Sequence, residues 1–142
     1  MGKRILLPVD GSDQSREACE FAFTEFSGVD IVFLHVIDPT EAGYSAQASI
    51  PSFSEEWYDQ AQAEAEELFA EMEQEVPAHD NDIETDTVVG RPARAIVEYA
   101  ADHEVDQIVM GSHGRSGVTR ILLGSVAESV VRNSPVPVTV AR

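Results

Sequence analysis

Short apolar runs alternate with segments of helical periodicity along the whole chain. The runs lie at residues 4–9, 30–37, 83–89, 106–111 and 135–140, and the helical segments lie at residues 15–26, from a capping box at 52–55 to about 75, at 93–103 and at 124–133. The second run, DIVFLHVI, is apolar on both faces and rich in β-branched residues, which indicates a strand covered on both sides. Strands that alternate with helices predict a parallel sheet with helices on both faces.

The length of 142 residues fits one domain, residues 1–142. Right-handed crossovers restrict the strand orders, and we expect a three-layer α/β fold whose five-stranded parallel sheet has a Rossmann-like or flavodoxin-like order. In the order 3-2-1-4-5 the winding reverses between strands one and four, and ligands of such sheets bind there, beyond the carboxyl ends of the strands. The loops at this point are residues 8–12 and 111–125, so we expect a ligand site between them.

Local signals predict helix ends and inward faces. Ser12 or Asp13 caps the first helix, and Pro92 occupies the first position of the third. Residues 38–53, which contain two prolines and a glycine, are expected to form a long loop. The inward stripe of the long second helix is expected to comprise Trp57, Ala61, Ala65, Leu68, Met72 and Val76, and that of the third helix Ala93, Ile96, Val97 and Ala100.

The charge of the chain limits its partners. There are 26 acidic and nine basic residues, a formal net charge of −17. Nucleic acids and anionic membranes repel such a surface, so neither is an expected partner. The acids dominate residues 1–87, whose net charge is −18, whereas residues 88–142 carry six arginines against five acids. An anionic ligand would therefore be tolerated only in the second part of the chain.

The basic residues are almost all arginines, since Lys3 is the only lysine. Abundant Asp and Glu with almost no Lys indicates adaptation to very high salt, and hence a halophilic source. At about 1 M salt the Debye length is only about 3 Å, so acidic self-repulsion fades. An acidic face that binds a partner is the alternative interpretation.

The sequence gives no sign of export or of membrane insertion. Its longest apolar runs fall far short of the roughly 18 residues of a membrane span, and its first residues lead straight into a strand without a signal segment. We therefore expect a cytoplasmic protein. Cys19 is the only cysteine, which excludes an internal disulfide and a cysteine-based zinc site, and its place on an apolar stripe predicts a buried core thiol.

A glycine-rich segment, GSHGRSGVTRILLGSV at residues 111–126, joins the fourth predicted strand to the last helix. Glycines let backbone amides approach phosphate oxygens, and a helix N-terminus attracts phosphate through its unpaired amides and its dipole. The amides expected to be unpaired here are those of Gly124, Ser125 and Val126, and Arg115 and Arg120 add positive charge. The alternative is that the glycines only shape a loop. The segment is neither a Walker A loop nor a dinucleotide-binding fingerprint.

Three segments together resemble the universal stress protein family, and the resemblance covers essentially the whole chain. The ATP-binding signature of that family is matched by Gly111, by Gly114 after two intervening residues, and by Gly124 and Ser125 after nine more. The opening ILLPVDGS at residues 5–12 and the ending SPVPV at residues 134–138 are also similar. The resemblance implies an adenine-nucleotide α-hydrolase-like fold of strand order 3-2-1-4-5, a homodimer and, because the signature is complete, ATP binding.

The resemblance also implies roles for single residues. Ribose and phosphates would lie on Gly111, Gly114, Gly124, Ser125 and Val126. The adenine side would be lined by Pro8, Val9 and Asp10, with Val36 packed on the base and Met110 near the ribose. From the residues themselves, His113 is expected as a loop or ribose contact and Arg115 as a positive charge beside the ligand. Asp10 has the alternative of an Asx turn or a helix cap, and Val36 belongs to the core in either case.

The histidines suggest no catalysis. No Ser-His-Asp constellation accompanies His35 or His113, so we assign no catalytic residue and no metal ligand. His79 and His103 are expected to face solvent.

Functions from different classes fit these observations. The first is a dimeric stress-response or signalling module that binds ATP or another adenine nucleotide, with or without Mg²⁺, and hydrolyses it slowly or not at all. Fast phosphoryl transfer needs charge neutralisation and an oriented nucleophile, and only arginines are available for the former. The alternative is a slow ATPase, or a nucleotide phosphohydrolase or transferase of the same superfamily. A third is an interaction protein that binds no nucleotide.

The expected homodimer pairs through residues 136–140, from Val136 to Val140, which form the last strand. Pro135 and Pro137 remove two amide donors from this edge strand and so protect one side of it. The remaining donors and the row of valines would be poorly hidden in a monomer.

Overall fold

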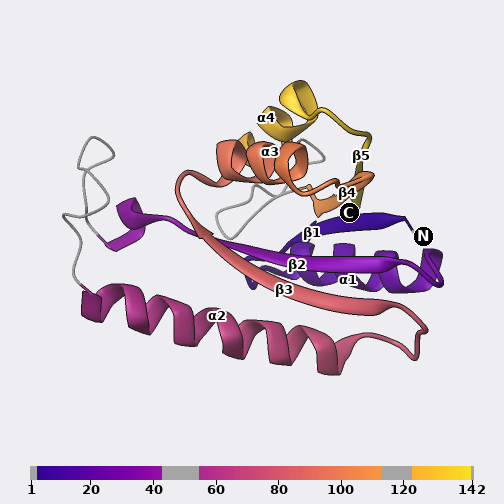
Figure 1. Ribbon diagram of the computed structural model, residues 1–142, viewed down its shortest axis with the longest axis horizontal. Helices are drawn as coiled ribbons and strands as arrows, with labels where there is room; N and C mark the ends of the chain where they lie inside the picture. The colour runs from indigo at the N-terminus through magenta and orange to yellow at the C-terminus, as the bar shows by residue number, and fades with distance from the viewer. Residues whose placement is uncertain (1–2, 43–54, 113–122, 142) are drawn as a thin grey trace.

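Five parallel strands form one sheet at the centre of the molecule. The computed structural model describes residues 3–42, 55–112 and 123–141. The strands are β1 (Arg4–Pro8), β2 (Asp30–Ile37), β3 (Asp82–Val89), β4 (Gln107–Gly111) and β5 (Val138–Ala141), in the order β3-β2-β1-β4-β5 (Figure 1). Every neighbouring pair is parallel, so the predicted strand order is confirmed.

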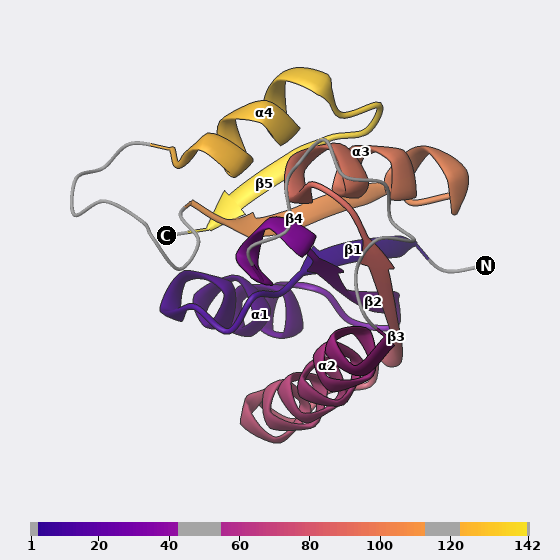
Figure 2. The same ribbon diagram turned by 90° about the vertical axis from the view of Figure 1, so that its left-hand side faces the viewer.

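The helices cover both faces of this sheet. They are α1 (Asp13–Glu25), α2 (Glu55–Glu75), α3 (Pro92–Asp102) and α4 (Ser125–Asn133), with a short 3-10 helix, η1 (Pro39–Ala42), after β2. Figure 2 shows α1 and α2 on one face and α3 and α4 on the other, which confirms the three layers. The helix η1 lies within the segment expected to be a loop, and residues 43–53 of that segment lie outside the described residues.

The last strand is shorter than expected. The sequence predicts a strand from Pro135, but β5 begins at Val138. Proline has no backbone N–H, so neither Pro135 nor Pro137 donates to the sheet. The carbonyl of Pro137 nevertheless accepts a hydrogen bond from the N–H of Ile108 at 2.9 Å, which brings the chain alongside β4 before the strand starts.

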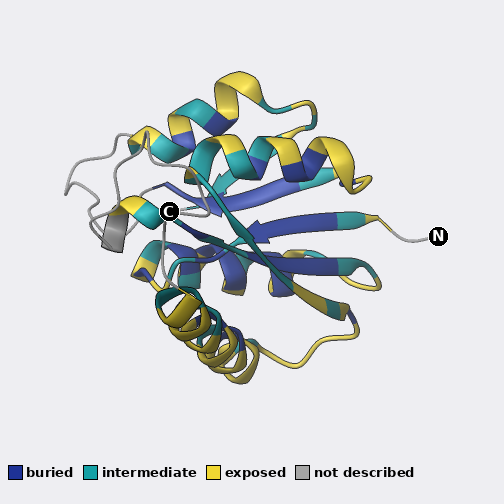
Figure 3. Ribbon diagram, turned by 60° about the vertical axis from the view of Figure 1, so that its left-hand side comes forward, coloured by how far each residue is buried: buried dark blue, intermediate teal, exposed yellow. Residues whose placement is uncertain are grey.

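Two apolar clusters hold the three layers together, and Figure 3 shows the buried strands between helices whose outer sides are exposed. Ile5 and Leu7 of β1 face α1 and α2, whereas Leu6 faces α3 and α4, as the alternation of a strand requires. On the first face, Phe69 of α2 stacks on Phe33 at a centroid distance of 6.3 Å. The predicted stripe of α2 placed Leu68 inward and omitted Phe69. Phe69 is buried and Leu68 only half-buried, because the Phe33 ring packs one position further along the helix.

The ends of α1 and α3 match their sequence signals. The Oγ of Ser12 accepts the N–H of Ser15 at 3.1 Å, so Ser12, not Asp13, caps α1. Pro92 begins α3, as predicted, and the residue before it, Arg91, occupies the N-cap position without a side-chain capping bond.

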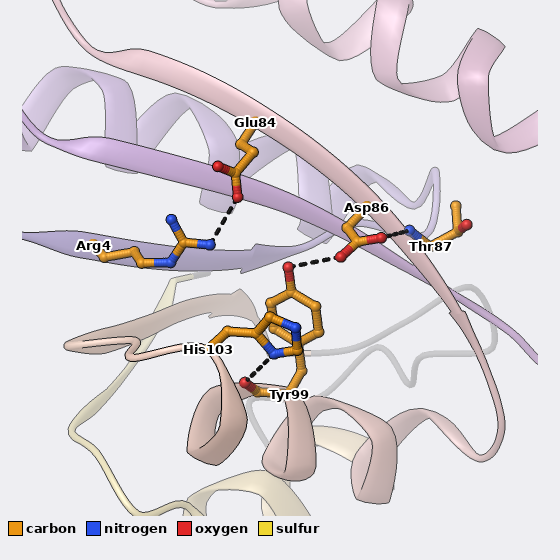
Figure 4. Close-up of polar contacts among 6 residues, drawn as sticks. All are labelled: Arg4, Glu84, Asp86, Thr87, Tyr99 and His103. Atoms are coloured by element: carbon orange, nitrogen blue, oxygen red, sulfur yellow. Dashed lines mark hydrogen bonds and ion pairs between the residues drawn. The ribbon is translucent and has the colours of Figure 1, made fainter.

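A polar contact clamps α3 onto β3 and buries a residue that the sequence stripe omitted. Tyr99 is 4% exposed, and its hydroxyl donates to the Oδ2 of Asp86 at 2.9 Å (Figure 4). The Oδ1 of Asp86 accepts the N–H of Thr87 at 2.9 Å. Burial, and then the hydrogen bond to Asp86, raise the pKa of Tyr99. His103 is exposed, as predicted, but its ring stacks on Tyr99 at a centroid distance of 3.7 Å.

Candidate functional site

The described ends of the two predicted ligand loops lie at one edge of the sheet. β1 and β4 are paired neighbours, and the winding of the sheet reverses between them. After β4, the carbonyl of Ser112 accepts the N–H of Gly124 at 2.7 Å, and the N–H of Ser112 donates to the carbonyl of Ala141 at 3.1 Å. These bonds tie the start of α4 to the end of β4. The carboxyl end of β1, the carboxyl end of β4 and the start of α4 therefore lie together, as expected.

The start of α4 offers fewer backbone donors than the sequence predicted. Gly124 is the N-cap, and its amide is already bonded to Ser112, so the prediction that this amide is unpaired is wrong. Ser125 and Val126 follow in the first helical turn, where an α-helix leaves N–H groups without an intrahelical acceptor. Ser125 is exposed and Val126 half-buried. Two amides at the positive end of the helix dipole thus remain suited to an anion.

Gly111 has a packing role in addition to any contact with a ligand. It is buried at the end of β4, and a Cβ built on it would lie 2.6 Å from both the carbonyl carbon and the carbonyl oxygen of Gln14 in α1. No side chain fits there unless the backbone of α1 moves. The absence of a side chain at Gly111 therefore lets α1 lie directly against β4.

The adenine side predicted at the end of β1 is built mostly from backbone and core atoms. The Oδ1 of Asp10 accepts the N–H of Ser12 at 2.9 Å, so the Asx turn that was the alternative for Asp10 is present. Val9 is 3% exposed and Met110 5% exposed, so their side chains belong to the core. A ligand would meet these two residues mainly through backbone atoms.

The remaining residues of that side come from β1 and β2. Pro8 and Val36 are half-buried, and Val36 packs against the apolar cluster beneath α3 and α4. The Nδ1 of His35 lies 2.8 Å from the carbonyl oxygen of Val9. Because a carbonyl only accepts, this contact requires the proton on Nδ1. His113, Gly114 and Arg115 lie outside the described residues.

A cavity of about 520 Å³ opens between the starts of α3 and α4. It is lined by Asp38, Thr40, Arg91, Pro92, Ala93, Arg94, Ser125, Val126 and Ser129. Ser125 and Val126 were predicted to bind phosphate, whereas Arg91 and Arg94 were not singled out. The signal for them was available, because in a parallel sheet the helices after β3 and β4 both begin at the carboxyl edge.

The charged groups of the cavity differ in how far they are already paired. The Oδ1 of Asp38 accepts both the N–H and the hydroxyl of Thr40, at 3.0 and 2.7 Å. The Nε of Arg94 pairs with Glu98 at 2.9 Å. Arg91 is exposed and has no ion pair among the described residues. The lining thus carries two guanidinium groups and one carboxylate in a chain whose net charge is −17.

Other reactive chemistry is sparse in the part of the chain that the structure describes. Cys19 is 2% exposed, and burial raises the pKa of its thiol to about 12, which confirms the predicted core thiol. His79 is exposed, and its ring lies edge-on to Phe23 at a centroid distance of 4.5 Å.

Residues 3–42, 55–112 and 123–141 contain no group of three or more His, Cys, Asp or Glu side chains placed to hold a metal ion. Within the same residues, no helix combines the length and apolar character that a membrane crossing requires.

Known proteins resemble this chain along its whole length. The family model described as the universal stress protein family matches residues 1–142. Universal stress protein MJ0531 of Methanocaldococcus jannaschii is 38% identical over 144 residues, covering 99% of this chain and 82% of that protein. The solved structure of MJ0577, from the same organism, has a TM-score of 0.83 and 34% identity, covering 99% of this chain and 96% of that one. A universal stress protein solved in complex with cAMP has a TM-score of 0.64 and 26% identity, covering 99% and 97%. Since the match extends from end to end, the chain belongs to the universal stress protein family.

Proposed function

We propose that this protein binds an adenine nucleotide at the carboxyl edge of the sheet. We propose further that this nucleotide is ATP and that the chain is of the ATP-binding type of the family. The observation that supports this most is the junction of β4 and α4. The bond of 2.7 Å between Gly124 and Ser112 fixes the start of α4 beside the point where the winding reverses. The cAMP complex of a relative supports an adenine nucleotide as the ligand class.

The ligand would lie across this edge of the sheet. The amides of Ser125 and Val126 would donate to phosphate oxygens, because they face outward at the positive end of the α4 dipole. The base would lie over Val36 and the backbone at Val9 and Asp10. His113, Gly114 and Arg115 would add contacts from the segment that follows β4. Any Mg²⁺ in the site would be bound to the phosphates of the nucleotide.

We propose further that hydrolysis is slow or absent. Rapid phosphoryl transfer needs positive charge on the transferred group and a positioned nucleophile. The only lysine, Lys3, precedes β1 at the opposite edge of the sheet, where its Nζ lies 6.0 Å from the centre of the Phe26 ring. No lysine can therefore contact phosphates bound at the start of α4. A phosphate-release assay tests this proposal, and steady turnover above about 1 s⁻¹ would contradict it.

Titration calorimetry with ATP, ADP, AMP and cAMP, each with and without Mg²⁺, tests the binding itself. We expect heat with at least one adenine nucleotide, and no binding to Gly124→Val, because a valine side chain would intrude where phosphate approaches. Ala101→Val is the matched control, since it adds a similar side chain at an exposed position near the other end of α3. Absence of heat with every adenylate, or equal affinities of wild type and Gly124→Val, would refute the proposed site.

The dimer is also proposed, through residues 136–140. β5 pairs only with β4, and Val138 and Val140 are half-buried in the single chain. A second copy would cover this edge and the valines on it. Light scattering is expected to give the mass of two chains, and the mass of one chain would contradict the proposal.

Adaptation to high salt, in a cytoplasm that is itself saline, is the last part of the proposal. The net charge of −17 supports it, because acidic self-repulsion is screened only at high ionic strength. The melting temperature is expected to rise between about 0.1 M and about 3 M KCl. Equal melting temperatures at the two concentrations would argue against salt adaptation.

A further inference from the structure

We propose that Arg91, in the cavity between α3 and α4, binds the outer phosphates of the nucleotide and makes the site prefer longer phosphate chains. This inference rests on the proposed function, because it assigns the far end of the same ligand. The cavity reaches Ser125 and Val126, where the first phosphates would bind, and extends from there to Arg91. Its volume of about 520 Å³ lies within the range of small-ligand sites.

The charge of Arg91 is not paired with a carboxylate in the part of the chain that the structure describes. Each of the other arginines in the described part of the chain has a carboxylate partner: Arg4 with Glu84, Arg16 with Glu75, Arg94 with Glu98 and Arg132 with Glu128. Arg91 has none among the described residues, although the chain holds 26 acids. A guanidinium that lines a cavity without a partner is suited to an anion from outside, and its planar fork matches phosphate oxygens.

The position of Arg91 also works against the stability of its own helix. N-cap positions favour Ser, Thr, Asp or Asn, whose side chains accept a backbone N–H, and Arg91 makes no such bond. The positive end of a helix dipole favours acids, and α1, α2 and α4 each carry one or two in their first turns. The first turn of α3 carries no acid and contains Arg94 instead. Folding alone therefore does not account for an arginine at this position.

The electrostatics of the cavity favour a polyanion over a single phosphate. Asp38 is the only carboxylate among the described residues of the lining, and its Oδ1 accepts two hydrogen bonds from Thr40. Asp38 forms no ion pair with Arg91, so the guanidinium group of Arg91 can meet the ligand charge directly. Each added phosphate brings negative charge closer to it, so its contribution grows from AMP to ATP. The ratio of ATP affinity to AMP affinity measures this contribution and is insensitive to changes in the binding of the base.

The test compares wild type with Arg91→Gln by titration calorimetry with ATP, ADP and AMP at constant ionic strength. Loss of one charge-assisted hydrogen bond is expected to weaken ATP binding by about tenfold or more, and AMP binding by far less. Arg132→Gln is the matched control, because it removes the same charge from an exposed arginine outside the cavity and should leave the ATP/AMP ratio unchanged. Arg91→Lys should restore part of the ratio, since it keeps the charge and loses the fork.

A second measurement separates ligand binding from a structural role. Without nucleotide, Arg91→Gln should melt at the wild-type temperature or above it, because a cation leaves the positive end of α3. A lower melting temperature would indicate a structural role and would contradict the inference. Equal ATP/AMP ratios in wild type and Arg91→Gln would overturn the inference alone. Failure of wild type to bind any adenine nucleotide would instead overturn the proposed function.

Discussion

Gly111→Ala tests whether the glycine at the end of β4 serves packing. The new Cβ would lie 2.6 Å from the Gln14 carbonyl carbon and oxygen and 2.8 Å from the Gln14 Cβ. Unstrained carbon contacts are about 3.5 Å or longer, so α1 and β4 must separate by about 1 Å. The start of α1 cannot shift alone, because the Ser12 cap and the Asx turn at Asp10 attach it to the end of β1.

The expected loss of stability follows from this overlap. Overpacking of this kind costs about 1–3 kcal/mol, and the reduced freedom of the unfolded chain returns about 0.4–1 kcal/mol. Taken near the middle of the two ranges, the net loss is about 1–2 kcal/mol. With 142 residues and an unfolding entropy of about 2.1 cal/mol/K per residue, 1 kcal/mol corresponds to about 3 °C. Gly111→Ala is therefore expected to melt about 3–7 °C below wild type.

Differential scanning calorimetry of the protein without nucleotide measures this shift, and Gly124→Ala is the matched control. Gly124 has φ −70° and ψ 168°, which alanine adopts without backbone strain, so the weaker N-cap is set against the entropic gain. We expect the melting temperature of the control to stay near that of wild type. If Gly111→Ala melts at or above the wild-type temperature, the packing argument is refuted. Nucleotide binding by Gly111→Ala well below its transition would show that the residue is needed by the fold more than by the ligand.

Three further predictions concern other parts of the fold. Asn81 is 7% exposed, and its side chain accepts a hydrogen bond from the N–H of Val29 and donates one to the carbonyl of Phe26. Asn81→Ala should therefore lower the free energy of unfolding, measured by urea denaturation, by about 1–3 kcal/mol. Because the pKa of Tyr99 is raised in the folded state, the protonated hydroxyl contributes fully to stability below the unfolded pKa of about 10. This contribution is lost as the pH rises from that value toward the higher pKa of the folded state. Between pH 10 and 11 wild type should therefore lose about 1 kcal/mol more than Tyr99→Phe, and parallel pH profiles would contradict this. The thiol of Cys19, with a pKa of about 12, should react with a thiol reagent only after unfolding; rapid labelling of the native protein would contradict its burial.

The sequence predicted the architecture because strand and helix periodicities are local signals. The run DIVFLHVI became β2 with the same bounds, and the Ser12 cap followed from a side chain three residues from its donor. The packing of Phe69 and Tyr99 could not be found in the same way. Phe69 is buried by Phe33 on a strand far away in the sequence, and Tyr99 is buried because Asp86 satisfies its hydroxyl. Without knowledge of a partner for its hydroxyl, a tyrosine is not predicted to lie on the buried face of a helix.

The arrangement of the elements around the candidate site was predictable, but the bonding of its individual donors was not. That the ends of β1 and β4 lie at one edge of the sheet follows from its topology, and the structure has this arrangement. The amide of Gly124 was expected to be unpaired, and only the tertiary contact to Ser112 shows otherwise. The spacing of the glycines likewise did not indicate that a side chain at Gly111 would collide with the backbone of Gln14 in α1. These contacts join segments distant in the sequence, and periodicity carries no information about them.

The distribution of charge is compatible with the proposed binding of a polyanion by so acidic a chain. The helix α2 carries nine acidic residues and no basic one, and it covers the face of the sheet opposite to α3 and α4 (Figure 2). The sheet and the helix radii place this acidic helix about 15–20 Å from the cavity. That separation is about twice the Debye length of about 8 Å at physiological ionic strength, so its repulsion at the cavity is largely screened. We therefore expect acidic substitutions on the outer side of α2 to change the salt dependence of stability without weakening the binding of an anion near Arg91.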